Sequence, residues 1–329
     1  MGKTIADMGE FGLIRSVTHD LIYRPELVKV GAGDDGAVYT VPEGYDQVIS
    51  TDTMVEGIHF NEKTMTPYDV GYKLCASNFS DMAAMGAEAI GFVISAALPG
   101  DLPYDWVSSC YEGIRACCKK YRVNLLGGDV TGSPKGIILT GTVVGMVPCD
   151  TAVKRSGAQV GDLVFVTDTI GDSAAGLEAL LSGKGKDYPQ VVMRHQRPEP
   201  QISLGKMLRE AGATSLNDIS DGLSRELTEI AKASGVVIEV EESRIPLSEE
   251  ACQLGQDIGK NPLSWAFNGG EDYELVGTIS PSSYEKIKGN KKVTIIGQVV
   301  EVSLDPYVYT MGQAGRLKLA VCGYDHFEK

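Results

Sequence analysis

Residues 31–42 read Gly31-Ala32-Gly33-Asp34-Asp35-Gly36-Ala37-Val38-Tyr39-Thr40-Val41-Pro42. The first six match G-x-G-x-x-G, the pattern of a dinucleotide-binding loop. That loop must lead into a helix, whereas Ala37–Val41 is rich in strand-forming residues and Pro42 ends the run. Two aspartates in the loop would also repel a pyrophosphate unless a cation lay between them. We therefore expect a strand–turn–strand that presents a carboxylate to a cation. Adjacent side chains on a strand diverge, so only one of Asp34 and Asp35 should face the site.

An acidic residue set among Gly, Ser, Thr or Asn recurs along the chain. Small residues let the backbone approach a ligand closely, and clustered oxygen atoms are the ligands that hard divalent cations require. The pattern therefore predicts a site in which Mg²⁺ organises phosphates. Besides Gly33-Asp34-Asp35, the members are Ser50-Thr51-Asp52-Thr53, Asn78-Phe79-Ser80-Asp81, Gly127-Gly128-Asp129, Asp218-Ile219-Ser220-Asp221-Gly222 and Gly269-Gly270-Glu271-Asp272.

Each of these elements also has a purely structural interpretation. Ser50–Thr53 ends an apolar strand, where such residues form a turn or helix cap as readily as a cation site. Asp81 lies in a predicted helix, on the face of Asn78 and an apolar stripe, so it needs either a cation or a salt bridge. Gly127–Asp129 follows another strand and would suit a simple turn. Asp218–Gly222 opens a predicted helix with more acidic residues than capping needs, which favours contact with metal and phosphate.

The composition bounds the class of protein. At 329 residues the chain has room for two domains, and its hydrophobic share of 43% is ordinary for globular proteins. No apolar run approaches the length of a membrane span, and Met1–Asp7 lacks the apolar core of a signal peptide. Seven cysteines without a C-x-x-C pair fit reduced thiols, so we expect a cytoplasmic protein with no membrane partner. A net charge of −14 argues against nucleic acid as a partner. A phosphate substrate could bind so acidic a protein only if cations lay between its oxygens and the carboxylates.

Hydrophobic periodicity predicts an α+β protein of two domains, 1–148 and 149–329, rather than one doubly wound sheet. A helix should begin at Pro67, behind the cap Thr66, and end at Gly86. Residues 183–186 are the best candidate for a flexible loop. Other helices are expected to open at Pro103 and to cover residues 174–181, 200–211, 220–233, 248–255 and 283–288. Strands are expected over residues 27–30, 37–41, 47–51, 91–98, 123–126, 137–147, 163–167, 236–240, 273–279 and 293–300.

Several common catalytic motifs are missing from the sequence. It has no His/Cys pattern for zinc, no G-x-S-x-G element and no Walker A loop. If the protein uses ATP, metal rather than a P-loop must hold the phosphates. His59 follows Asp52 within the same stretch, although a surface position is the default interpretation of such a histidine.

Taken together and in order, these elements resemble the thiamine-monophosphate kinase family. That family shares a superfamily with aminoimidazole ribonucleotide synthetase and selenophosphate synthetase. The last of these needs a reactive Cys or selenocysteine near its N-terminus, and the first cysteine here is Cys75. The resemblance runs nearly end to end, through Gly9–Ile14, Gly33–Asp35, Ser50–Phe60, Asn78–Ala87, Gly127–Asp129, Lys154–Gly157, Asp218–Leu223, Gly269–Leu275 and Gly323–Phe327.

The resemblance implies roles for individual residues. Several Mg²⁺ ions would be held by Asp35, Ser50, Thr51, Asp52, Asp81, Asp129, Asp218 and Asp221. ATP would be contacted by Tyr111, Gly128, Asp129, Arg155 and Ser220. Thiamine monophosphate would be contacted by His59, Glu271 and Tyr324. An aromatic ring and a carboxylate suit a cationic thiazolium, although the tail aromatic varies in this family.

The resemblance further implies an aminoimidazole ribonucleotide synthetase-like architecture. Its strand-rich N-terminal α/β domain would bind metal and ATP and form a homodimer, and its C-terminal α/β domain would complete the ATP and substrate site. The implied reaction moves the γ-phosphoryl group of ATP onto the phosphate of thiamine monophosphate. That phosphate is already anionic, so no residue need act as acid or base.

Three alternatives stay open at this point. A relative of the same superfamily would use ATP with another small molecule. A two-metal phosphohydrolase would cleave phosphoesters without ATP. A non-catalytic Ca²⁺-binding protein is the third, although the sequence lacks the D-x-[DN]-x-[DN]-G loop.

Overall fold

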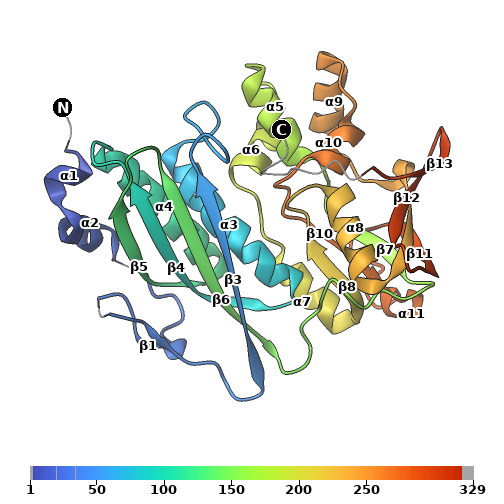
Figure 1. Ribbon diagram of the computed structural model, residues 1–329, viewed down its shortest axis with the longest axis horizontal. Coiled ribbons are helices and arrows are strands. Elements are labelled where there is room, and N and C mark those ends of the chain that lie inside the picture. The colour runs from blue at the N-terminus through green and yellow to red at the C-terminus, as the bar shows by residue number, and fades with distance from the viewer. Residues whose placement is uncertain (1–2, 20, 34, 321–329) are drawn as a thin grey trace. The chain divides into compact units, whose positions relative to one another are not determined.

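The computed structural model describes residues 3–19, 21–33 and 35–320, and its chain divides into two units (Figure 1). The N-terminal unit comprises Met1–Met82 and Ala87–Asp150. The C-terminal unit comprises Ala83–Gly86 and Thr151–Lys329. Each unit has its own sheet and helices, which confirms the predicted α+β class. Within the described residues, no helix is both long and apolar enough to cross a membrane.

The N-terminal unit is built on a four-stranded sheet in the order β3-β6-β4-β5. The pair β4–β5 is parallel, and the other two pairs are antiparallel. The four strands are β3 (Tyr45–Val55), β4 (Glu88–Leu98), β5 (Asn124–Gly132) and β6 (Ile138–Pro148). The remaining elements are α1 (Ile5–Met8), α2 (Glu10–Val17), η1 (Pro25–Leu27), β1 (Val28–Val30), β2 (Val38–Tyr39), α3 (Pro67–Ala84) and α4 (Tyr104–Tyr121).

Helices α3 and α4 cover one face of this sheet (Figure 1). They pack closely on each other, because a Cβ at Gly113 of α4 would lie only 1.9 Å from the carbonyl oxygen of Tyr68 in α3. Phe79 of α3 meets Phe92 of β4 edge to face, with ring centroids 5.4 Å apart. The opposite face keeps apolar side chains exposed, among them Ile49 of β3, which is 70% exposed. The sheet therefore has a covered face and an open face.

The C-terminal unit is built on a seven-stranded sheet in the order β13-β12-β9-β11-β7-β10-β8. Only the pair β12–β9 is parallel. Its strands are β7 (Leu163–Thr167), β8 (Ala213–Asp218), β9 (Val236–Glu241), β10 (Leu275–Ile279), β11 (Val293–Val302), β12 (Tyr307–Gly312) and β13 (Gly315–Lys318). Its helices are α5 (Asp172–Leu181), α6 (Pro189–Gln196), α7 (Ile202–Ala211), α8 (Leu223–Ser234), η2 (Glu242–Arg244), α9 (Glu249–Ile258), α10 (Pro262–Asn268) and α11 (Pro281–Tyr284).

Both faces of the seven-stranded sheet are covered around β7. Val164 and Val166 pack into a core that includes Ile230 of α8. Phe165, which points the other way, packs with Leu208 of α7. Burial on both faces explains why Leu163–Thr167 reads as a continuous apolar run rather than an alternating one.

The structure corrects several sequence-based boundaries. Ser50–Thr53 does not end its strand but lies inside β3, where β-branched threonines favour extended backbone. Gly127–Asp129 likewise lies within β5 rather than after it. Asp218 ends β8, and the helix predicted from Ser220 begins only at Leu223, after Gly222. The predicted helix start at Pro67 is confirmed. The sequence analysis did not anticipate β8, α6, α10, β12 and β13. The helix expected over 283–288 is instead the shorter α11.

Candidate functional site

In the N-terminal unit, the structure brings Ser50 and Asp81 into direct contact. The Ser50 hydroxyl on β3 donates a hydrogen bond of 2.5 Å to the Oδ2 atom of Asp81 on α3. Asp52 lies two residues further along β3, so its side chain is on the same face of the strand as Ser50. The backbone N–H of Asp52 donates to the Oδ1 atom of Asn78, one helical turn before Asp81, at 3.1 Å. Three of the predicted oxygen ligands therefore gather where α3 crosses β3.

The position of Asn78 explains why the neighbouring strand needs a glycine. Asn78 is fully buried, and its Nδ2 atom donates to the carbonyl of Leu74 at 2.8 Å. A Cβ at Gly141, which pairs with Asp52, would lie 2.6 Å from that same nitrogen. Gly141 therefore lets the helix approach closely enough to anchor the backbone of Asp52.

Thr51 and Asp129 lie on the open face of the sheet instead. The Thr51 hydroxyl donates to the carbonyl of Gly141 at 2.7 Å. The strand register places Asp129 in one row with Ser95, Thr140 and Thr53. The strands β5 and β3 are the two edges of the sheet. Asp129 on β5 is therefore three strand spacings, roughly 14 Å, from Thr53 at the β3 end of this row. Within this unit the predicted ligands thus divide between two faces.

The other predicted residues of this unit have individual surroundings. Asp35 is exposed in the turn before β2, and Asp34 lies outside the described residues. The Nδ1 atom of His59 accepts the backbone N–H of Val55 at 3.0 Å, so the neutral ring carries its proton on Nε2. Tyr111 lies on α4, where burial raises the pKa of its phenol. A Cβ at Gly128 would meet the carbonyl of Ile94 at 2.0 Å, so the strand pairing alone requires this glycine.

In the C-terminal unit, the end of β8 runs beside the Gly269–Asp272 segment. The backbone N–H of Glu271 donates to the carbonyl of Ser220 at 2.7 Å, and that of Tyr273 donates to Ile219 at 2.9 Å. A Cβ at Gly270 would lie 2.5 Å from the Ser220 carbonyl. The structure therefore places the predicted substrate residue Glu271 against the predicted ATP residue Ser220. Tyr324 lies outside the described residues.

The backbone of this segment is held in an unusual conformation. Glu271 has a φ of 67° and Tyr273 a φ of 54°, both in the left-handed region that non-glycine residues rarely adopt. Such conformations persist only where surrounding contacts impose them. The carboxylate of Asp272, between these two residues, supplies one such contact by accepting the backbone N–H groups of Gly171 at 2.7 Å and Ser173 at 3.0 Å.

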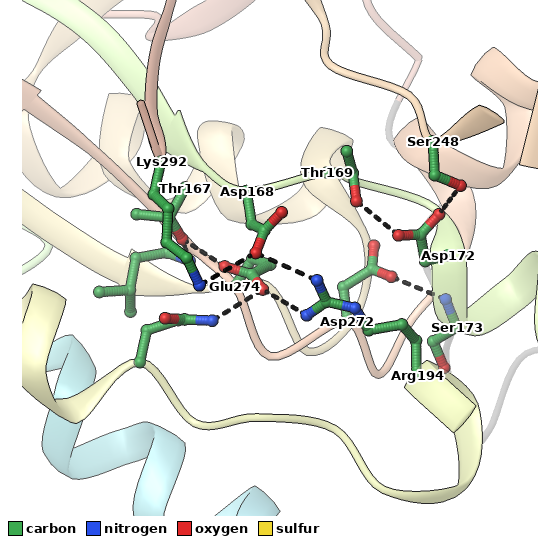
Figure 2. Close-up of polar contacts among 12 residues, drawn as sticks. Thr167, Asp168, Thr169, Asp172, Ser173, Arg194, Ser248, Asp272, Glu274 and Lys292 are labelled. Carbon is green, nitrogen blue, oxygen red and sulfur yellow. Dashed lines mark hydrogen bonds and ion pairs between the residues drawn. The ribbon is translucent and has the colours of Figure 1, made fainter. Parts of the chain in front are cut away.

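Next to Asp272, a buried polar network surrounds Glu274 (Figure 2). Glu274 is 2% exposed and accepts hydrogen bonds from the Thr167 hydroxyl at 2.6 Å and from Gln201 at 2.9 Å. Arg194 lies 3.4 Å from Glu274 and 3.0 Å from Asp168. Burial raises the pKa of Glu274 to about 8, against the hydrogen bond from Thr167 and the charge of Arg194, which lower it. Burial also raises the pKa of Asp272 to about 7.

Sequence reasoning did not identify His195 on α6, which lies beside Glu271. Its ring is 2% exposed, and its Nδ1 atom is 3.1 Å from the Ser173 hydroxyl and 3.8 Å from the Glu271 carboxylate. A lone histidine in an unpredicted helix carries no local signal. Only the fold, which brings residues 195 and 271 together, reveals it.

A second buried network joins the predicted residues Arg155 and Asp221. The Nε atom of Arg155 donates to the Oδ1 atom of Asn217 at 2.9 Å. The Nδ2 atom of Asn217 donates to Oε2 of Glu226, and Oε1 of Glu226 accepts the backbone N–H of Asp221 at 3.3 Å. Burial, with the nearby charge of Asp221, raises the pKa of Glu226 to about 7. Asn217 and Glu226 were also missed by sequence reasoning.

The donor set of both units suits magnesium. Asp52 and Asp81 with Ser50 in one unit, and Asp218 and Asp221 in the other, offer oxygen atoms, the donors that Mg²⁺ prefers. In the part of the chain that the structure describes, no three His, Cys, Asp or Glu side chains form a ready-made metal cage. Mg²⁺ commonly binds one or two carboxylates and completes its shell with substrate phosphates and water.

The stability of the C-terminal unit is expected to fall as the pH rises from about 5 to about 8. Asp272 and Glu274 have folded-state pKa values raised to about 7 and about 8, from 3.8 and 4.5. Between these values the folded state holds more protons than the unfolded state, so stability present at low pH is lost as each group ionises. The loss approaches ~1.4 kcal/mol per pH unit for each group.

Thermal unfolding followed by calorimetry between pH 5 and pH 8 tests this dependence. Glu274→Gln removes one of the titrating groups and should flatten the decline. Glu285→Gln, which changes an exposed glutamate paired with Lys288, is the matched control and should keep the slope of the parent. Identical slopes for the parent and Glu274→Gln would contradict the prediction.

Comparison with protein families places both units in one superfamily. Residues 33–147 match the model described as AIR synthase related protein, N-terminal domain. Residues 159–305 match the model described as AIR synthase related protein, C-terminal domain. The expected aminoimidazole ribonucleotide synthetase-like architecture is therefore confirmed.

Individual relatives narrow the family. The chain is 38% identical to the thiamine-monophosphate kinase of Bacillus subtilis (strain 168) over 331 residues, 98% of this chain and 100% of that protein. It is similar to the crystal structure of thiamine-monophosphate kinase from Stenotrophomonas maltophilia K279a, with a TM-score of 0.80, 31% identity and coverage of 92% and 95% of the two chains. It is also similar to AaThiL complexed with AMPPCP and TMP, with a TM-score of 0.79, 33% identity and coverage of 99% and 100%. By these full-length similarities, the chain belongs to the thiamine-monophosphate kinase family.

Proposed function

We propose that this chain uses ATP to phosphorylate thiamine monophosphate, giving thiamine diphosphate and ADP. The observation that carries the proposal is its similarity, over 99% of its length, to a protein whose structure was solved with AMPPCP and TMP. AMPPCP stands in for ATP with a bridging group that resists transfer. The pair of ligands on that relative is a nucleotide donor and a phosphate acceptor, which is what a kinase of this kind requires.

The chemistry makes electrostatic positioning the main task of the protein. The attacking phosphate oxygen is already anionic, so direct in-line transfer of the γ-phosphoryl group needs no general base. Bringing two polyanions together costs about 4 kcal/mol per like-charge pair at ~4 Å and an effective dielectric of ~20. Bound Mg²⁺ would supply the positive charge that screens this repulsion. The exposed Arg155 side chain would add a fixed cation from the protein.

The proposed magnesium ligands come from one cluster of oxygen-bearing side chains in each unit. Asp52, Asp81 and Ser50 would hold metal from the N-terminal unit, and Asp218 and Asp221 from the C-terminal unit. Backbone and side-chain contacts already orient Ser50 and Asp52. Several ions are proposed, and the set is completed by Asp35, Thr51 and Asp129.

The substrate contacts are proposed on the same basis. ATP would meet Tyr111, Gly128, Asp129, Arg155 and Ser220. Thiamine monophosphate would meet His59, Glu271 and Tyr324. Glu271 suits this role because its carboxylate is 26% exposed while the backbone on both sides of it is firmly held. A partly exposed anion on a rigid segment favours a cationic ring such as thiazolium.

We further propose that the chain forms a cytoplasmic homodimer through its N-terminal units. The open face of the four-stranded sheet supports this, since it exposes Ile49, Val93 and Ile138 at 70%, 36% and 37%. Apolar side chains gathered on one sheet face favour burial against another protein surface.

The direct test is to mix the purified protein with ATP, Mg²⁺ and thiamine monophosphate and to assay for thiamine diphosphate. Product should require all three components and should be lost when Mg²⁺ is chelated. Phosphate release without ATP would favour a two-metal phosphohydrolase instead. ATP use with another small molecule, but not with thiamine monophosphate, would favour a different member of the superfamily. Calorimetry that detects Ca²⁺ binding but no turnover would favour a non-catalytic protein.

A further inference from the structure

We propose that Glu226 is a positioning residue that orients the Arg155 guanidinium toward the phosphates of ATP by acting through Asn217. The inference rests on the proposed function, because it takes Arg155 as a residue that contacts ATP. Glu226 itself would touch neither substrate. Its role would be to fix a donor group that the reaction uses.

The first step of the relay is the bond between Arg155 and Asn217. The Nε–H of Arg155 donates to the Oδ1 atom of Asn217 at 2.9 Å. Arg155 is exposed, whereas Asn217 in β8 is 2% exposed. A guanidinium carries further N–H groups on its two Nη atoms, which can bind a phosphate in a bidentate manner. Holding the Nε edge from inside the protein therefore fixes the plane in which the Nη groups meet a ligand.

The second step is the orientation of the Asn217 amide. An arginine can only donate hydrogen bonds, so Arg155 requires the amide oxygen of Asn217. A carboxylate can only accept, so Glu226 requires the amide nitrogen, and Nδ2 of Asn217 does donate to Oε2 of Glu226. If the amide turned over, both bonds would be lost at once. Glu226 thus selects the one amide orientation that can hold Arg155.

The third step is the anchoring of Glu226 itself. It lies on α8, is 3% exposed, and its second oxygen accepts the backbone N–H of Asp221 at 3.3 Å. Among the described residues, no Lys or Arg side chain forms an ion pair with Glu226. The cation that this buried carboxylate faces is therefore Arg155, reached across the amide of Asn217. A carboxylate kept only for packing would not need an amide relay that ends on an exposed arginine.

The test compares Glu226→Gln with the parent in the full chain, measuring kcat, the KM for ATP and the KM for thiamine monophosphate. In the parent, the two carboxylate oxygens of Glu226 accept one hydrogen bond from Asn217 Nδ2 and one from the Asp221 N–H. Glutamine has only one side-chain oxygen, and its N–H₂ group must face one of these two donors, so one of the two hydrogen bonds is lost. We expect kcat/KM for ATP to fall roughly 10- to 100-fold, the range for loss of one hydrogen bond to a charged group. The KM for thiamine monophosphate should stay within about two-fold.

The matched control is Glu229→Gln, on the same helix, where an exposed glutamate pairs with Lys232. It makes the same chemical change and should leave all three kinetic values at parent levels. Asn217→Ala is the second variant, in case Glu226→Gln does not fold. It breaks the relay in its middle and should produce the same defect, selective for ATP. The melting temperature of each variant shows whether it is folded.

The decisive measurement is the double variant. If Glu226 acts through Arg155, then Glu226→Gln should add less than about two-fold in an Arg155→Ala background. A full additional loss in that background would overturn the proposal, as would equal rises in the KM for ATP and for thiamine monophosphate. A fully active Glu226→Gln in a parent that makes thiamine diphosphate would overturn this inference alone. A parent that forms no thiamine diphosphate would overturn the proposed function itself.

Discussion

Asp52→Ala is expected to lower kcat at least ~10³-fold, because loss of a magnesium ligand removes several kcal/mol of transition-state stabilisation. The fold should survive. Asp52 lies on an edge strand and is held by its backbone, which bonds Asn78 and pairs with Gly141, and the variant keeps both contacts. The melting temperature should therefore change little while turnover is abolished.

Steady-state assays of thiamine diphosphate formation over a range of Mg²⁺ concentrations check this result. If the variant is rescued in part by high Mg²⁺, the defect lies in metal binding. Asp46→Ala is the matched control, since Asp46 is an exposed aspartate on the same strand whose carboxylate accepts the backbone N–H of Asp150. Asp46→Ala should keep parental activity. Normal turnover in a folded Asp52→Ala protein would refute the role proposed for Asp52.

Glu274→Ala is expected to have the largest effect on stability. It leaves the buried Gln201 amide and Thr167 hydroxyl without their acceptor and removes one of the two carboxylates that Arg194 contacts, the other being Asp168. Leaving a buried donor without its acceptor costs about 1–3 kcal/mol for each group. In a unit of this size each kcal/mol lowers the melting temperature by about 2–4 °C, so a fall of about 10 °C is expected.

Calorimetry of the parent, Glu274→Ala and Glu285→Ala measures the effect. Glu285 is the control, because it is an exposed glutamate whose partner Lys288 lies three residues away on the surface. Exposed pairs contribute little, so Glu285→Ala should melt within about 2 °C of the parent. If Glu274→Ala did the same, the network around Glu274 would not hold the unit together.

Local signals predicted the elements that depend on neighbouring residues. Thr66 and Pro67 mark the start of α3, and the structure confirms it. The acidic elements were found because carboxylates beside glycines and hydroxyls form a pattern within five residues or fewer. The same local view misjudged Ser50–Thr53 as a strand end, because strand length depends on the partner strand β6, whose residues lie about 90 positions away.

Residues that act through distant contacts gave no such signal. Asn217 meets Arg155 across 62 positions, and Gln201 meets Glu274 across 73. His195 lies in a helix that the sequence did not predict. Each of these side chains is common in polar positions of any protein, so their identity alone could not indicate a partner.

By itself the sequence determined the family, the α+β class and the kind of chemistry, because these follow from ordered local patterns and from the oxygen donors present. Because the structure extends β3 through Val55, the strand period puts Ser50 and Asp52 on one face and Thr51 on the other. Only the tertiary structure decided which face meets α3 and Asp81, and which buried groups hold Arg155 and the Glu271 segment. That choice is made by packing between segments far apart in the chain, as at Gly141, where the missing Cβ leaves room for the side chains of Phe92 and Asn78.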